Sequence, residues 1–90
     1  MNREIFNLVT FNSTHSAIRA ERELLNEGIK VKVIPVPTEI TASCGLSIRM
    51  KLEDLEKVKN ILKNNDIETA GYYHVEKLGL KKNISTIKEV

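Results

Sequence analysis

Cys44 is the only cysteine of this 90-residue chain, and it is the residue best suited to covalent chemistry. It lies in the run Thr41-Ala42-Ser43-Cys44-Gly45, whose small side chains are typical of a loop. Ser43 offers little bulk to shield the sulfur, and Gly45 lets the backbone approach a partner closely or adopt a positive φ. We therefore expect a solvent-reachable thiol. Free cysteine is also among the most buried residue types and often packs as a small hydrophobe, so the local sequence leaves that second reading open.

Length and composition limit what such a thiol could do. Ninety residues predict one small domain with a modest core. A single cysteine cannot form an internal disulfide, and residues 1–6 lack the apolar run of a signal peptide, so we expect a cytoplasmic protein with a reduced thiol. No apolar stretch approaches the ~20 residues of a membrane helix. The 14 basic and 12 acidic residues give a net charge of +2, which is too small to indicate a nucleic-acid or membrane partner.

The apolar pattern changes its period along the chain and predicts six elements, in the order strand, helix, strand, strand, helix, strand. They are expected at residues 5–11, 14–27, 29–35, 46–50, 53–64 and 67–75. This order predicts an α+β fold of ferredoxin-like βαββαβ layout, with two helices on one face of a four-stranded antiparallel sheet. We expect one domain over residues 1–75, followed by a polar, lysine-rich tail at 76–90 that is loosely attached.

This layout says where Cys44 should lie. With a right-handed crossover, the loop before the third strand shares one edge of the sheet with the start of the first helix, so Cys44 should lie near Ser13, Thr14 and His15. Unpaired N–H groups and a partial positive charge at a helix start favour a thiolate over a thiol. His15 could add a proton acceptor or a positive charge, and Arg19 could extend the favourable potential.

The same residues also have simpler interpretations. Ser13 and Thr14 are of types that commonly cap helices. A histidine in a first helical turn is usually solvated, and His15 with Cys44 would lack the third, orienting group of a hydrolytic nucleophile, which argues against a protease or amidase. His74 belongs to the last predicted strand, and we expect it to lie far from Cys44.

The sequence gives no sign of a metal, a cofactor or a nucleic-acid partner. One cysteine and two separated histidines cannot supply the four ligands of structural zinc, and no glycine-rich phosphate loop is present. Lys30, Lys32 and Arg49 could form a basic stripe on the sheet, as in RNA-binding sheets of this topology. The strand at 46–50 lacks the paired aromatic residues that stack on bases, so we interpret the stripe as a solvated or dimer surface.

Three segments of the chain resemble a known family. They are Thr10–Ala17, Gly28–Ile40 and Ser43–Leu46, and the most specific part is Pro-x-Pro-x-Glu-Ile at residues 35–40 followed by Ser-Cys-Gly. These segments resemble the selenium/sulfur carrier-like proteins, a family of short bacterial domains, over residues 5–75. The resemblance implies that Cys44 is the thiol that bears sulfur or selenium, with Gly45 as its neighbour.

Our leading hypothesis is that Cys44 takes up sulfur or selenium as a persulfide-type adduct and delivers it to a partner enzyme. Such carriage is not turnover, so we expect no enzyme activity, and the partners would be unidentified donor and acceptor proteins. The task needs an accessible thiolate. Ser13, Thr14, Ser43 and Gly45 would form its surroundings, with His15 in support.

Two alternatives remain open. The chain could be a small interaction or ligand-binding regulatory module in which Cys44 is structural, because folds of this kind serve many unrelated functions. It could also be an oxidation sensor, whose thiol would have to pair with a second protein or a second copy. The edge strands of the predicted sheet leave room for a homodimer.

Overall fold

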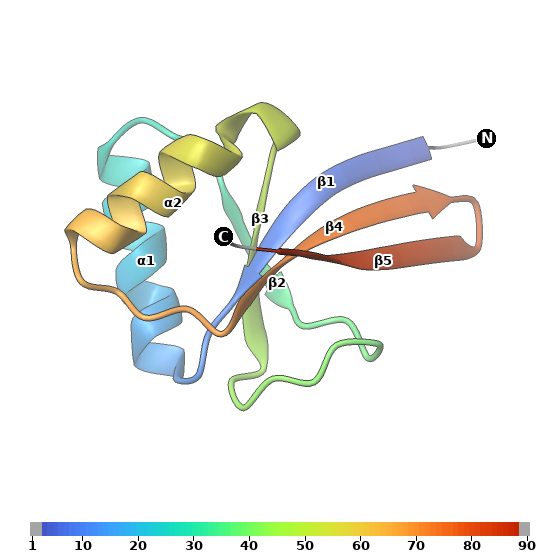
Figure 1. Ribbon diagram of the computed structural model, residues 1–90, viewed down its shortest axis with the longest axis horizontal. Coiled ribbons are helices and arrows are strands. Elements are labelled where there is room, and N and C mark those ends of the chain that lie inside the picture. The colour runs from blue at the N-terminus through green and yellow to red at the C-terminus, as the bar shows by residue number, and fades with distance from the viewer. Residues whose placement is uncertain (1–2, 89–90) are drawn as a thin grey trace.

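The computed structural model describes residues 3–88, which form a five-stranded antiparallel sheet and two α-helices (Figure 1). The strands are β1 (Arg3–Thr10), β2 (Lys32–Pro35), β3 (Leu46–Met50), β4 (Gly71–Leu78) and β5 (Lys81–Ile87). The helices are α1 (Thr14–Asn26), the single 3₁₀ turn η1 (Leu52–Asp54) and α2 (Leu55–Asn64). The strand order is β2-β3-β1-β4-β5, and every neighbouring pair is antiparallel.

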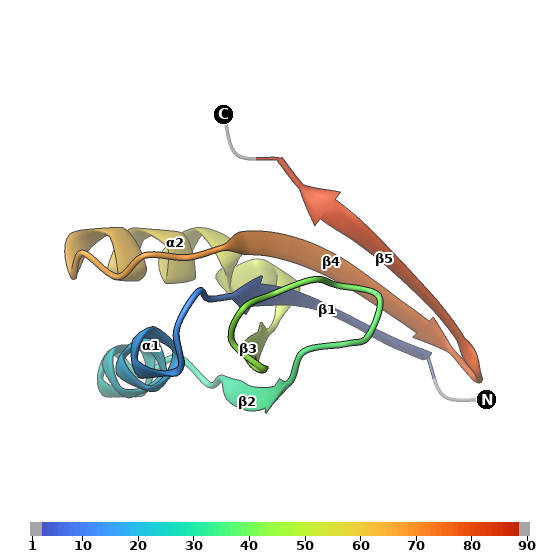
Figure 2. The same cartoon turned by 90° about the horizontal axis from the view of Figure 1, so that it is seen from below.

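The predicted α+β class with two helices and an antiparallel sheet is confirmed, but the predicted number of strands, four, is wrong. The fifth strand, β5, comes from the segment expected to be a tail, and it pairs with β4 from Tyr72↔Ile87 to Leu78↔Lys81. Figure 2 shows β5 curling away from β1. The two isoleucines of β5, Ile84 and Ile87, are three residues apart and pack on opposite faces of the sheet. The segment therefore lacks the period-two apolar pattern of a strand with one covered face.

Two predicted strands begin later than expected because their first apolar residues close the preceding helices. Ile29 N–H donates to Leu24 O at 3.0 Å, and Ile67 N–H donates to Leu62 O at 2.9 Å. Each bond spans six residues, and the residue before each isoleucine has a positive φ, 81° at Gly28 and 54° at Asp66. This pattern defines a Schellman motif, in which the isoleucine also packs near the leucine that accepts its hydrogen bond. Strand β2 therefore begins at Lys32 and β4 at Gly71.

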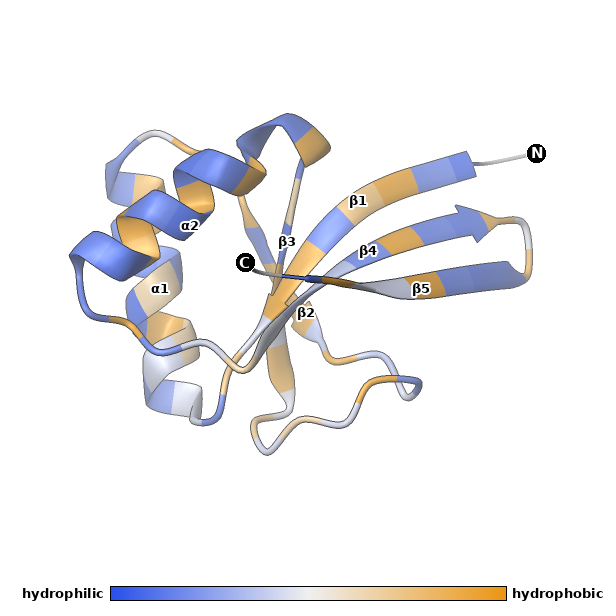
Figure 3. Ribbon diagram, in the orientation of Figure 1, coloured by the Kyte–Doolittle hydropathy of each residue, from blue (hydrophilic) through white to orange (hydrophobic). Residues whose placement is uncertain are grey.

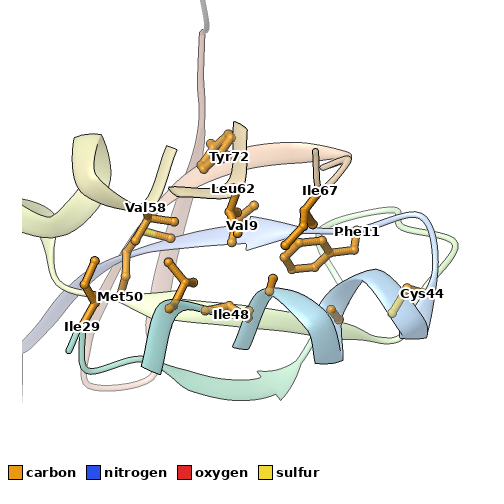
Figure 4. Close-up of a cluster of buried hydrophobic side chains, with 13 residues drawn as sticks. Val9, Phe11, Ile29, Cys44, Ile48, Met50, Val58, Leu62, Ile67 and Tyr72 are labelled. Carbon is orange, nitrogen blue, oxygen red and sulfur yellow. The ribbon is translucent and has the colours of Figure 1, made fainter. Parts of the chain in front are cut away.

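The core consists of two clusters, one on each face of the sheet. The first cluster lies between the sheet and the helices (Figure 4) and contains Val9, Phe11, Ala17, Ala20, Leu24, Ile29, Cys44, Ile48, Met50, Val58, Leu62, Ile67 and Tyr72. The second cluster lies on the opposite face and contains Phe6, Leu8, Ile40 and Val75, with Ile34, Val36, Tyr73 and Ile84 packed against it. Figure 3 shows two hydrophobic bands along β1 with a hydrophilic band between them, which fits a strand that is covered on both faces. Within residues 3–88, neither helix has the length and apolar character that a membrane crossing requires.

The two Schellman motifs yield a first prediction. Replacing Gly28 with alanine meets no atom within 4 Å but forces an L-residue into the left-handed region, which should cost about 1–2 kcal/mol in the free energy of unfolding. Gly45→Ala is the matched control, because Gly45 has equally open space and no positive φ, and it should change stability by less than about 0.5 kcal/mol. Urea denaturation of both variants measures this, and equal losses would contradict the role assigned to Gly28.

Candidate functional site

Cys44 lies at the end of the Cys44 loop, residues 36–45, which joins β2 to β3. The expectation of a solvent-reachable thiol is wrong, because Cys44 is only 3% exposed and belongs to the first cluster. Figure 4 shows its side chain near the beginning of α1. Ser43 and Gly45, on either side of it, are exposed. The backbone of the loop therefore lies at the surface while the sulfur points inward.

Two polar groups contact the sulfur. The backbone N–H of Leu46 donates to Cys44 Sγ at 3.3 Å, and the thiol donates to Thr14 Oγ1 at 3.7 Å. Thr14 is the first residue of α1 and is itself exposed. The topology thus brings the thiol and the start of α1 together, and the sulfur contacts a residue that is itself exposed.

Within residues 3–88, no hydrogen bond joins Ser13, His15 or Arg19 to Cys44. Ser13 caps α1, since its Oγ accepts the Ser16 N–H at 3.1 Å. His15 is exposed. Arg19 donates to Asn65 O at 2.9 Å and so links α1 to the end of α2 rather than serving the sulfur.

His74 has a structural partner that sequence reasoning missed. Its Nδ1 lies 2.9 Å from Oδ1 of Asn7, a buried residue directly opposite it on β1. Because that oxygen can only accept, Nδ1–H donates and the pair satisfies a polar group inside the sheet. Among residues 3–88, no group of three or more His, Cys, Asp and Glu side chains is placed to hold a metal ion.

The predicted basic stripe is partly occupied by internal contacts. The guanidinium of Arg49 lies 3.9 Å from the centre of the Phe6 ring and forms an ion pair with Glu4 at 2.9 Å. Lys32, opposite Arg49 in the sheet register, is exposed, as is Lys30. Arg49 therefore covers one end of the second cluster instead of presenting a free cation.

The Cys44 loop is fastened at several points. At its base, Val36 N–H donates to Gly45 O at 3.0 Å, which continues the pairing of β2 with β3. In its middle, Ile40 is 7% exposed and packs in the second cluster. Glu39 Oε1 lies 3.7 Å from Lys82 Nζ on β5. The loop is thus held to the sheet and to the strand that the sequence analysis did not anticipate.

The carboxylate of Glu39 is stabilised where it lies. A hydrogen bond from its own backbone N–H lowers the pKa of Glu39 below 4.5, Lys82 and the Thr38 hydroxyl add to this effect, and partial desolvation opposes it. A lowered pKa in the folded state means that ionised Glu39 stabilises the fold above the ordinary value. That contribution is lost as the pH falls through the lowered pKa.

The pH dependence of stability tests this arrangement. Between pH 5 and pH 3, wild type should lose more of its free energy of unfolding than Glu39→Gln, which has no charge to lose. An NMR titration should place the midpoint for Glu39 below 4.5. Lys82→Met should move that midpoint upward, because it removes a neighbouring positive charge. A midpoint at or above 4.5 in wild type would contradict the contacts described for Glu39.

Comparison with known proteins identifies relatives of the chain. A family model described as "Putative Se/S carrier protein-like" matches residues 6–74. The protein described as "Uncharacterized protein MJ0011" of Methanocaldococcus jannaschii is 34% identical over 84 residues, which make up 92% of this chain and 42% of that relative. The chain therefore spans less than half the length of this relative. No solved structure matches the chain.

Proposed function

Since the chain belongs to the Se/S carrier protein-like family, we propose that Cys44 holds sulfur or selenium as a persulfide-type adduct and delivers it to a partner protein. The observation that carries this proposal is the placement of the thiol, within the matched residues, between Leu46 N–H and Thr14 Oγ1. Both groups suit a sulfur that becomes anionic, because the hydroxyl of Thr14 can rotate to donate where it now accepts. We further propose a cytoplasmic location, where a thiol stays reduced.

The fold proposed for this function is a ferredoxin-like unit with one added strand. The order β2-β3-β1-β4 and the two helices account for the βαββαβ part, and β5 extends the sheet beyond it. In this layout, the crossover through α1 sets the start of the helix beside the Cys44 loop. The function thus depends on topology more than on any residue adjacent to Cys44 in sequence.

The transfer step balances without an external oxidant. Ionised Cys44 attacks the outer sulfur of a persulfide on a donor cysteine, so a new S–S bond forms at Cys44 while the S–S bond of the donor breaks. The electron pair of the broken bond leaves on the donor cysteine as a thiolate, and the proton of Cys44 has already passed to water. In delivery, a nucleophile of the acceptor attacks the terminal sulfur, and Cys44 returns as a thiolate. Selenium would follow the same path.

The burial of the sulfur means that Cys44 must turn outward for transfer. Its neighbours Ser43 and Gly45 are exposed and the sulfur contacts the exposed residue Thr14, which supports a movement confined to this part of the loop. Residues 10–17 and 33–48 carry Glu39 as their sole Asp, Glu, Lys or Arg. Because the centres of protein interfaces are depleted in charge, a partner protein could approach this edge without desolvating ions.

Sulfur loading tests the proposal directly. Incubation of the full chain with a cysteine desulfurase and cysteine should raise the intact mass by one or more sulfur atoms. Dithiothreitol should reverse the gain. Cys44→Ser, which preserves the size of the side chain, should gain none. If wild type gains no sulfur, or Cys44→Ser gains as much, the carrier function is wrong.

A second candidate function is a small interaction module in which Cys44 is structural. Its specific support is the 3% exposure of Cys44 and its place in the first cluster, which is the usual environment of an unreactive cysteine. In this case the contacts with Leu46 and Thr14 would merely satisfy a packed thiol.

Alkylation of the native protein separates the two candidates. A carrier needs local opening, so native Cys44 should react with iodoacetamide faster than the rate set by global unfolding, which is measured from urea denaturation and refolding kinetics. A structural cysteine should react only at the global rate. Wild type in urea provides the reference for a fully accessible thiol, and Cys44→Ser provides the background.

A further inference from the structure

The Cys44 loop wraps around one end of the sheet. Ile40 packs in the second cluster, on the face opposite the helices, while Cys44 packs in the first cluster, on the face that the helices cover. Only residues 41–43 separate the two anchors, and none of them is buried. Because so short a connection has little slack, the position of Ile40 limits how far Cys44 can turn.

Strand β5 is joined to the outer part of this loop by an ion pair and by a shared apolar cluster. Lys82 Nζ lies 3.7 Å from Glu39 Oε1, and Ile84 packs against the second cluster that contains Ile40. Lys82 and Ile84 are two residues apart, so they extend from the same face of β5. One face of β5 therefore forms the ion pair with Glu39 and contributes to the apolar cluster in which Ile40 packs.

The strand that makes these contacts lies outside the part of the chain that the family model matches. The family match ends at residue 74, whereas β5 spans Lys81–Ile87. The chain thus combines a matched region that contains Cys44 with an additional strand that contacts the Cys44 loop.

We propose that β5 is a latch that controls the exposure of Cys44. While Lys82 pairs with Glu39, and Ile84 packs against the cluster that contains Ile40, the sulfur stays in the first cluster. When these contacts open, residues 43–45 can rotate and present the sulfur to a partner. The biological purpose of the latch rests on the proposed carrier function, but its mechanical action on the thiol does not.

The two halves of the latch should differ in strength. The Glu39–Lys82 pair is partly solvated, with side chains 49% and 29% exposed, so salt screens it and its contribution is small. The apolar contact of Ile40 is nearly dry and should dominate.

The rate at which iodoacetamide alkylates Cys44 in the folded full chain measures the latch. Lys82→Met, which keeps most of the side chain length and removes the charge, should raise the rate by about two- to fivefold. Added salt should raise the wild-type rate but leave that of Lys82→Met unchanged. Ile40→Ala should raise the rate at least about tenfold. Exchanging the charges, with Glu39→Lys and Lys82→Glu together, should restore slow alkylation that neither single change shows.

Matched controls separate the latch from general loss of stability. Lys81→Met removes a charge from the neighbouring position of β5 and should leave the rate unchanged. Ile29→Ala truncates the same type of side chain at the opposite end of the first cluster from Cys44 (Figure 4), so it should lower stability without speeding alkylation of the folded protein as much as Ile40→Ala. If Ile40→Ala does not fold, Ile40→Val replaces it, with a smaller expected increase.

The latch is wrong if Ile40→Ala or Ile40→Val and Lys82→Met react at the wild-type rate, or if Ile29→Ala accelerates alkylation as much as Ile40→Ala. This outcome is distinct from failure of the carrier function. A wild type that gains no sulfur from a desulfurase overturns carriage and leaves the alkylation result standing, whereas loading of sulfur with unchanged alkylation in the variants overturns the latch alone.

Discussion

The burial of β1 on both of its faces is the constraint on which the rest of the structure depends. Residues 6–10 of this central strand are all buried, so each face of the sheet needs its own cover. The helices cover one face and bury Val9 and Phe11. On the other face, Phe6 and Leu8 share a cluster with Ile40 of the Cys44 loop, and Ile84 of β5 packs against it. The loop is therefore part of the core, and its path fixes where the thiol lies.

Hydrophobic periodicity was sufficient to predict the α+β class, the helices and the strand at Leu46–Met50. The same spacing of five residues separates Leu24 from Ile29 and Leu62 from Ile67. Its physical cause is that both helices end in the same Schellman motif, so the isoleucines belong to helix ends and not to strands. The second motif was not predicted because Asp66, and not a glycine, occupies its left-handed position.

The site was predictable in place but not in orientation. Topology alone sets the Cys44 loop beside the start of α1, which is why the contact with Thr14 could be anticipated. The direction of the sulfur depends on what the rest of the loop packs against. The surroundings of the loop include Lys82 and Ile84, which are more than 35 residues away in sequence. Small residues around a cysteine indicate a flexible backbone, but they do not predict whether the cysteine side chain points to solvent or to the core. A thiol kept beneath the surface between encounters is also shielded from oxidants that attack exposed thiolates.

Strand β5 is the last in the sheet, so one row of its backbone N–H and C=O groups has no neighbouring strand. Residues 77–88 contain four lysines and no aspartate or glutamate. Of these lysines, Lys81 and Lys82 belong to β5, and within residues 3–88 only Lys82 of the two forms an ion pair, with Glu39. Two copies meeting edge to edge would bring their β5 lysines together, and this repulsion opposes the endless stacking of chains that an open edge invites. Lys82 thus fastens a loop within its own molecule, and its neighbour Lys81 leaves a positive charge on the open strand.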